Sequence, residues 1–111
     1  HWMHVAMVFM DGAKMSKSLG NLVFVDALRK EWDPRAIRMA IIHHHYRFEW
    51  EWTNDQMPVA LKRLNSWVGS VGSPESPNLL NEVREHLDND LDTPSAMSAI
   101  DRAISHLGDL R

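Results

Sequence analysis

The chain has 111 residues, no cysteine and a formal net charge of −3, and 44% of its residues are hydrophobic. This length allows one domain with a modest core, and the composition excludes a disordered or low-complexity chain. Without cysteine there is neither a disulfide nor a thiolate metal site. No apolar run approaches the roughly 20 residues that span a bilayer, and residues 1–10 lack the pattern of a signal peptide. We therefore expect a soluble, cytoplasmic protein.

Charge is distributed unevenly along the chain. Residues 1–74 carry nine Lys and Arg against seven Asp and Glu, whereas residues 75–111 carry three against eight. The first part is therefore slightly basic and the second clearly acidic. Surfaces that bind nucleic acid are usually basic, because neutralisation of phosphates supplies most of the affinity. The C-terminal third is a poor candidate for binding nucleic acid.

The first part of the chain is predicted to contain one strand and two helices. Residues 2–10 form an apolar run that ends at a turn dipeptide, Asp-Gly at 11–12, which predicts a buried strand. A short helix is expected over 25–31. Pro34 is suited to open a second helix, which continues to about His44.

The middle of the chain is predicted to be extended and then helical. Residues 48–52 alternate between aromatic and acidic side chains, which places three aromatic rings on one face: Phe48, Trp50 and Trp52. The helix that follows has two alternative caps. Thr53 has capping-box spacing to Gln56, whereas Asp55 as cap would leave Pro58 in the first turn. Its apolar stripe comprises Met57, Ala60, Leu61, Leu64, Trp67 and Val68.

Two further helices are expected after residues 69–77, whose Gly, Ser and Pro content is typical of a linker. The first is marked by apolar residues at helical spacing, namely Leu80, Val83 and Leu87. Thr93 as cap and Pro94 as first helical residue open the second. The apolar face of that second helix comprises Met97, Ile100, Ile104 and Leu107.

The sharpest feature of the sequence is the segment Lys14–Ser18 (KMSKS), which follows the predicted strand and turn. Two lysines three residues apart, with serines beside them, suit a polyphosphate, because ammonium groups are compact charges and hydroxyl groups donate hydrogen bonds. Gly20 gives the loop freedom to close over a site. The alternative is a solvated surface loop, which the strand–loop–helix context disfavours.

Lys14–Ser18 resembles the KMSKS signature of class I aminoacyl-tRNA synthetases. Three further stretches are similar to the cysteine-activating branch of that family, namely His1–Asn21, His45–Arg47 and Asp90–Pro94. The resemblance extends over essentially the whole chain.

The resemblance also implies a fold class and a division of the chain. The fold is expected to be mainly α, with one or two short strands and the KMSKS loop from the end of a class I synthetase-type catalytic domain. Residues 1–47 are expected to form that end of the catalytic domain, and residues 48–111 a C-terminal helical bundle.

Two kinds of enzyme share the cysteine-activating branch. One esterifies cysteine to tRNA, and the other joins it by an amide to the amino group of glucosaminyl-inositol in the mycothiol biosynthesis of actinobacteria. Leu22–Val25, Trp50–Thr53 and Asp90–Pro94 are closer to the second kind. The acidic segment 75–111 also disfavours tRNA, although a basic module could follow it. A third possibility is a helical interaction module with an accidental KMSKS, which predicts no effect of nucleotide.

The resemblance implies roles for particular residues. Cysteine would be activated by ATP as cysteinyl-adenylate, with Lys14 and Lys17 stabilising charge on the pyrophosphate as catalytic residues. Lys17, Ser16 and Ser18 would bind ATP. Val8 matches a position whose backbone contacts the adenine, and the alternative is a core residue of the strand. The implied small-molecule partners are ATP, cysteine and glucosaminyl-inositol, with tRNA only under the alternative.

Two features of the family are missing, the HIGH motif and the cysteine-based zinc site. We therefore expect a C-terminal fragment that is inactive alone, with the N-terminal catalytic part of the same protein as its partner and with zinc bound by ligands outside this chain. No metal is expected here. Consecutive side chains of His43–His45 would point about 100° apart on a helix, and the histidines at positions 1 and 4 fall on opposite faces of a strand. The acidic cluster lacks the Gly and Glu of a calcium loop: Asp88, Asp90 and Asp92.

Structural roles are expected for the remaining conspicuous residues. Arg47 could contact a phosphate or form an ion pair with Glu49 or Glu51, and a structural role is favoured. Core packing is favoured over base stacking for the tryptophans of the middle segment and the helix after it, Trp50, Trp52 and Trp67.

Overall fold

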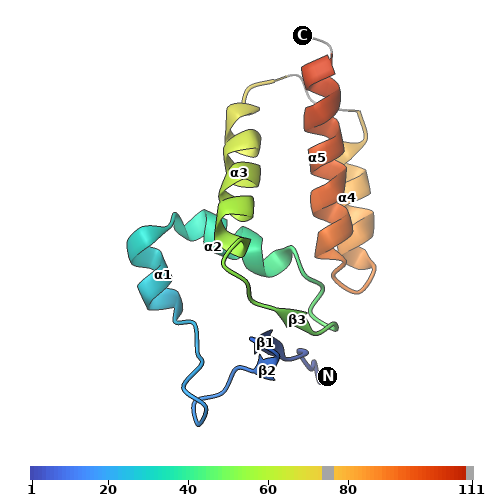
Figure 1. Cartoon of the computed structure of the whole chain (residues 1–111). Coiled ribbons are helices and arrows are strands. Elements are labelled where there is room, and N and C mark those ends of the chain that lie inside the picture. The colour runs from blue at the N-terminus through green and yellow to red at the C-terminus, as the bar shows by residue number, and fades with distance from the viewer. Residues whose placement is uncertain (74–76, 110–111) are drawn as a thin grey trace.

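The computed structural model of the chain describes residues 1–73 and 77–109. Within them it holds five helices and a three-stranded sheet, in the order β1, β2, α1, α2, β3, α3, α4 and α5 (Figure 1). The expected fold class is confirmed, because helices dominate and all strands are short. Across the described ranges, no helix combines the length and the apolar character that crossing a membrane requires.

The sheet is small and is built around β1 (Val8–Met10). It pairs antiparallel with β2 (Ala13–Lys14) and parallel with β3 (Trp50–Glu51). Asp11 and Gly12 connect β1 to β2, and both have positive φ, 53° and 79°. Two-residue hairpins favour this geometry because its twist matches that of the strands, and Asp-Gly is one of the dipeptides that adopt it. The hairpin directs the chain into the KMSKS segment.

The buried strand predicted over residues 2–10 is wrong in extent. Only residues 8–10 form a strand, and they are half-buried, whereas residues 1–5 are exposed, with Trp2 92% exposed. A backbone hydrogen bond attaches the segment before β1 to the turn at Tyr46: the N–H of Ala6 donates to the carbonyl of Tyr46 at 2.8 Å. The apolar pattern predicts burial, but no neighbouring strand among the described residues covers this segment.

The first two helices follow the prediction closely. α1 (Val25–Glu31) has the expected bounds, and α2 (Pro34–Ile42) begins at the expected proline and ends two residues early. Asp33 caps α2, because its Oδ1 accepts the N–H of Arg35 at 2.9 Å. Hydrogen bonds from the side chain and backbone of Arg35 hold the pKa of the Asp33 carboxyl below its ordinary value.

The predicted extended segment 48–52 is shorter in the structure, where β3 comprises two residues. Phe48 is 68% exposed and lies in a turn, because its N–H donates to the carbonyl of His45 at 3.1 Å. The aromatic face predicted for this segment is therefore wrong for Phe48. Trp50 and Trp52 are half-buried.

α3 (Gln56–Gly69) begins after Asp55, the second of the two predicted caps, although the Asp55 side chain makes no capping hydrogen bond. Pro58 therefore lies in the first turn, where its missing N–H leaves no hydrogen bond unmade. The hydroxyl of Thr53 donates to the Asp55 carboxylate and not to the helix. The predicted linker begins at the end of this helix, and residues 74–76 lie outside the described residues.

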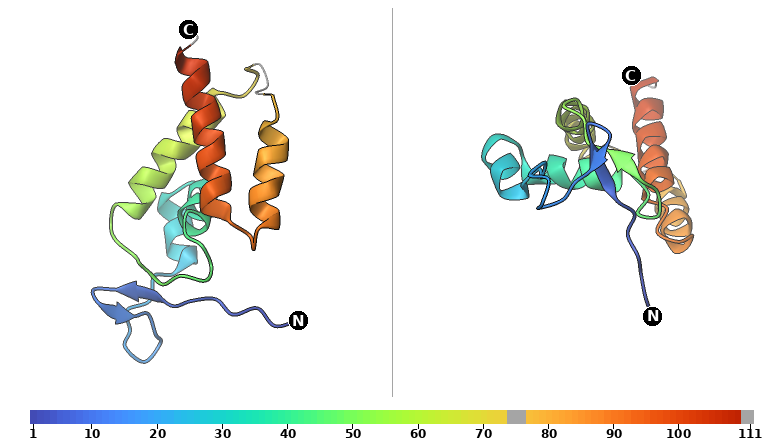
Figure 2. Two further views of the ribbon diagram at one scale, coloured as in Figure 1. Left: turned by 90° about the vertical axis from the view of Figure 1, so that its right-hand side faces the viewer. Right: turned by 60° about the horizontal axis from the view of Figure 1, so that its bottom comes forward.

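α4 (Leu79–Asp88) and α5 (Thr93–Asp109) lie side by side, as both views of Figure 2 and Figure 1 show. Asp92 caps α5, because its Oδ1 accepts the N–H of Ser95 at 3.1 Å. Hydrogen bonds from the side chain and the backbone of Ser95 lower the pKa of the Asp92 carboxyl. The predicted cap at Thr93 is therefore wrong by one residue, since an aspartate at the preceding position can accept the same type of bond.

The core lies where α2, α3 and α5 meet. Its fully buried members are Ala36, Ile37, Met39, Ala40, Met57, Ala60, Leu64 and Met97. Trp52 and Trp67 are partly buried against this cluster, so the predicted packing of these two rings is confirmed. Val68 is 47% exposed, against the prediction, and none of the ten residues of α4 is fully buried.

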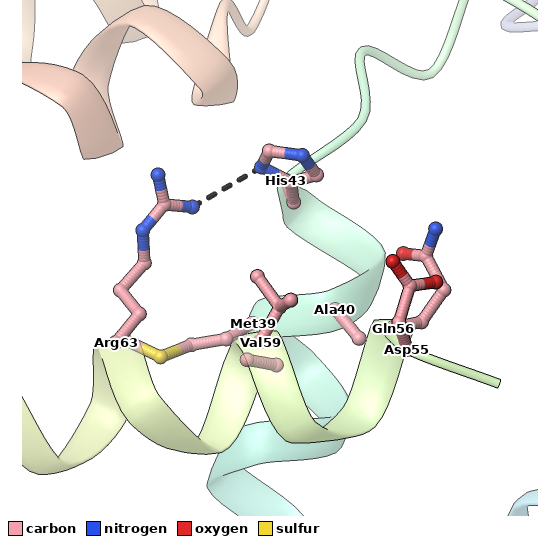
Figure 3. A pocket seen from close by; sticks show the side chains of 8 residues that line it. Met39, Ala40, His43, Asp55, Gln56, Val59 and Arg63 are labelled. Carbon is pink, nitrogen blue, oxygen red and sulfur yellow. Dashed lines mark hydrogen bonds between the residues drawn. The ribbon is translucent and has the colours of Figure 1, made fainter. Parts of the chain in front are cut away.

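A polar network connects α3 to α5 and to the end of α2. Nε of Arg63 and Nε1 of Trp67 donate to Asp101, at 3.0 and 2.8 Å. Nη1 of Arg63 also lies 3.1 Å from Nδ1 of His43, beside a cavity of about 120 Å³ between α2 and α3 (Figure 3). Arginine can only donate, so this contact requires a His43 ring whose Nδ1 accepts, which is a neutral ring. Burial, and secondarily the nearby His44 and Arg63, lower the pKa of His43.

Acid is therefore expected to destabilise the chain through His43. Because its pKa in the folded chain lies below the unfolded value near 6.5, the stabilisation is present above about pH 6.5 and is lost as pH falls through the folded pKa. Urea unfolding of the chain and of His43→Gln between pH 8 and pH 5 tests this. The glutamine can still accept a hydrogen bond but does not titrate, so its stability should fall less toward pH 5. Equal pH dependence in both proteins would contradict the prediction.

Candidate functional site

The KMSKS segment begins with Lys14 in β2 and continues as a compact loop that leads toward α1 (Figure 1). Ser16 organises the loop: its N–H donates to Oδ1 of Asn21 at 2.9 Å, and its Oγ accepts the N–H of Leu19 at 3.2 Å. The hydroxyl oxygens of Ser16 and Ser18 lie 3.3 Å apart. Both serines are thus engaged with one another inside the loop.

Asn21 joins the two ends of the loop. Besides accepting from Ser16, its Nδ2 lies 3.3 Å from the carbonyl oxygen of Lys14 and 3.5 Å from that of Ala13. Gly20 makes the reversal possible, because its φ of 69° is one that side chains with a Cβ rarely adopt. Asn21 is the third residue after the motif, and the sequence gives no sign of this bridging role.

The two lysines of the motif extend from this fixed backbone. Lys14 and Lys17 are both exposed. Within residues 1–73 and 77–109, neither side chain takes part in an ion pair or hydrogen bond. Figures 1 and 2 show the loop on the outside of the molecule, beside the small sheet. Two accessible ammonium groups on one ordered loop suit a polyanion such as a polyphosphate.

Val8 lies next to the motif in space. Its carbonyl accepts the N–H of Met15 at 2.9 Å, and it pairs with Trp50 of β3. A second contact attaches the hairpin to β3, because the N–H of Gly12 donates to Oε1 of Glu51 at 2.9 Å. The structure thus brings Val8 and the KMSKS loop together, while the contact of Val8 with adenine stays a prediction.

Replacing Asn21 with alanine is expected to loosen the loop without unfolding the chain. The variant loses one acceptor and one donor, which costs about 1–2 kcal/mol at this half-buried position. Hydrogen exchange at residues 15–20 should become about 5- to 30-fold faster, with α2 and α3 unchanged. Asn65→Ala, at an exposed position of α3, is the matched control. Unchanged exchange at Ser16 and Leu19 would contradict the bridging role of Asn21.

Two stretches that are more than forty residues apart meet at a second cluster. The Tyr46 hydroxyl and Nε of Arg47 both donate to the Asp90 carboxylate, and Nε2 of His45 lies 3.0 Å from the Asp90 carbonyl oxygen. The hydrogen bonds from Tyr46 and Arg47 lower the pKa of Asp90, and the one to Asp90 raises the pKa of Tyr46. The structural role predicted for Arg47 is therefore confirmed, but its ion pair is with Asp90 and not with Glu49 or Glu51.

The backbone at this cluster is strained. Asp90 and Leu91 have φ values of 53° and 54°. For residues with a Cβ, this left-handed conformation costs roughly 1–2 kcal/mol each, although aspartate tolerates it better than leucine. Such a conformation persists only where surrounding contacts hold it. The contacts from His45–Arg47 supply that restraint at Asp90.

Comparison with known proteins identifies the family. The family described as "tRNA synthetases class I (C) catalytic domain" matches residues 1–62, which is more than half of the chain. The chain belongs to this class I tRNA synthetase family. The resemblance expected from KMSKS is thereby confirmed.

Several curated relatives of this class I synthetase chain share the printed name "L-cysteine:1D-myo-inositol 2-amino-2-deoxy-alpha-D-glucopyranoside ligase". The protein of Streptomyces coelicolor is 51% identical over 105 residues, covering 91% of this chain and 26% of the relative. That of Streptosporangium roseum is 52% identical over 103 residues (90% and 25%), and that of Thermobifida fusca is 49% identical over 117 residues (98% and 28%). The expected similarity to ligases of cysteine and glucosaminyl-inositol is confirmed. The chain spans about a quarter of the length of these relatives.

The described residues of this class I synthetase chain do not fit a zinc site. The chain has no cysteine. Its three consecutive histidines face different partners: His43 faces Arg63, His45 faces Asp90, and His44 both stacks on Trp50 and bonds to Gln56 at 3.1 Å. Among the described residues, no three His, Cys, Asp or Glu side chains are grouped to hold a metal ion. Zinc stays a prediction for ligands outside this chain.

Proposed function

We propose that this chain is part of an ATP-dependent ligase that activates cysteine as cysteinyl-adenylate and joins it by an amide to the amino group of glucosaminyl-inositol. One observation carries the proposal: about 50% identity extends over nine tenths of the chain to proteins named as that ligase. The KMSKS loop, with its two accessible lysines, supports the nucleotide-dependent step.

In the first step, an oxygen of the cysteine carboxylate attacks the α-phosphorus of ATP. A mixed anhydride forms and pyrophosphate leaves. The protein forms no covalent bond in such a transfer, so it acts by positioning and by stabilising charge. We assign charge stabilisation on the leaving pyrophosphate to the ammonium groups of Lys14 and Lys17. Ser16 and Ser18 supply hydroxyl donors for the phosphates once their bond to one another is exchanged for bonds to ATP. The backbone of Val8 contacts the adenine.

In the second step, the amino group of the sugar attacks the carbonyl carbon of the adenylate. The bond from that carbon to the phosphate oxygen breaks, AMP leaves, and the nitrogen loses a proton to give the amide. We assign the binding of cysteine and of the acceptor to parts of the natural polypeptide outside residues 1–111. Because the reaction consumes ATP, we place it in the cytoplasm.

The first step is tested by cysteine-dependent exchange of labelled pyrophosphate into ATP. The assay uses the natural full-length polypeptide that contains these residues. Exchange is expected with cysteine and not with serine, which differs by one atom. Absence of exchange with cysteine would contradict the proposed function.

A second candidate is cysteinyl-tRNA synthesis, because the matched family is one of tRNA synthetase catalytic domains. The two candidates share the first step and differ in the acceptor, which is a ribose hydroxyl of tRNA in one and an amine in the other. The acidic C-terminal third, with three Arg against eight Asp and Glu, disfavours tRNA.

A further inference from the structure

We propose that Asp90 is a positioning residue for the KMSKS loop. From the connection between α4 and α5, it holds the turn His45–Arg47 to which the strand before the loop is attached. Asp90 thereby determines the positions of Lys14 and Lys17. The inference rests on the proposed function, since that function gives the loop a reaction for which it must be positioned.

Three consecutive residues converge on Asp90. Tyr46 and Arg47 donate to its two carboxylate oxygens, one each, and His45 bonds to its carbonyl oxygen at 3.0 Å. The nitrogen Nε of Arg47 is also 3.1 Å from the Tyr46 hydroxyl oxygen, so the two donors support one another. One residue of the α4–α5 connection therefore fixes the whole turn that follows α2.

The same turn is bonded to the hairpin that carries the loop. The carbonyl of Tyr46 accepts the N–H of Ala6 at 2.8 Å, two residues before β1 begins. Val8, the first residue of β1, accepts the N–H of Met15, which is the second residue of the motif. Hydrogen bonds, together with the covalent segments of Tyr46 and of residues 6–8, thus connect Asp90 to the KMSKS loop.

Stability alone does not account for this cluster. The side chains of Arg47 and Asp90 are 61% and 45% exposed, and exposed ion pairs contribute little to the free energy of folding. The cluster also keeps Asp90 in a left-handed conformation that costs free energy. Strain held by several contacts is typical of sites where geometry matters for function.

Asp90→Asn tests the proposal in the natural full-length polypeptide. Asparagine keeps the size and tolerates the left-handed conformation, but it removes the charge that pairs with Arg47. Asp88→Asn is the matched control, because Asp88 is exposed and has no side-chain partner among the described residues. The two readouts are hydrogen exchange over residues 13–21 and the kcat and cysteine KM of pyrophosphate exchange.

Asp90→Asn is expected to speed hydrogen exchange in the loop about 5- to 10-fold and to lower kcat about 10-fold, with the cysteine KM unchanged. Tyr46→Phe should act in the same direction, and Asp88→Asn should match the unaltered protein. The proposal would be overturned if Asp90→Asn showed the same hydrogen exchange in the loop and the same kcat as the unaltered protein. It would also be overturned if hydrogen exchange became equally faster in α2 and α3, because that would indicate general destabilisation. If the unaltered protein shows no pyrophosphate exchange, the proposed function fails, and hydrogen exchange alone still decides the role of Asp90.

Discussion

Replacing Lys17 with alanine is expected to slow cysteine-dependent pyrophosphate exchange by about 10²–10³-fold, because a group that stabilises charge in a transition state typically contributes that much. The change should fall mainly on kcat, since the negative charge on the pyrophosphate grows as it leaves. The assay compares the variant with the unaltered full-length polypeptide over a range of ATP concentrations.

The stability of Lys17→Ala should be unchanged within about 0.5 kcal/mol, because Lys17 is exposed and its side chain has no partner among the described residues. The matched control is Lys62→Ala, which removes the same side chain from an exposed position of α3. If Lys17→Ala exchanged pyrophosphate at the unaltered rate, the role assigned to Lys17 would be contradicted. That result would favour a helical interaction module in which the KMSKS sequence is accidental. Equal losses in both variants would show a nonspecific effect of charge.

Replacing Met97 with alanine is expected to lower the free energy of unfolding by about 2–4 kcal/mol. Met97 is 2% exposed and is the α5 residue of the core cluster formed with α2 and α3. Truncation removes most of a buried side chain and leaves a cavity that rigid helices fill only in part. Urea unfolding followed by tryptophan fluorescence measures the loss, with Trp52 and Trp67 beside the core as probes.

Val59→Ala is the control for this substitution. Val59 lies on α3 and is 56% exposed, so its truncation should cost less than about 0.5 kcal/mol. A loss below 1 kcal/mol in Met97→Ala would mean that α5 does not pack on α2 and α3 as described. Because α5 joins the α4–α5 pair to the rest of the chain, that result would also weaken the account of Asp90.

Local signals in the sequence predicted the helices well. The cap at Asp33 and the proline after it fix the start of α2 through bonds within a few residues. The dipeptide Asp11-Gly12 likewise fixes the hairpin turn. The buried strand predicted over residues 2–10 was wrong for a nonlocal reason. Whether an apolar run is buried depends on neighbouring elements, which a local pattern does not specify.

The candidate site was predicted in part. The KMSKS residues could be found because charge and hydroxyl groups recur within five positions. The bridging amide of Asn21 and the contacts of Asp90 could not, since each depends on how distant backbone segments meet. Arg47 illustrates the difference: neighbouring glutamates suggested a local ion pair, but the turn after α2 directs its side chain to a residue 43 positions away.

The most direct test of the account is a transfer assay with the natural full-length polypeptide, supplied with ATP and cysteine and offered glucosaminyl-inositol and cysteine tRNA side by side. The account predicts an amide of cysteine with the amino sugar, formed with loss of AMP and abolished by Lys17→Ala. Transfer of cysteine to tRNA alone would contradict it and would assign the chain to the tRNA-charging members of its family.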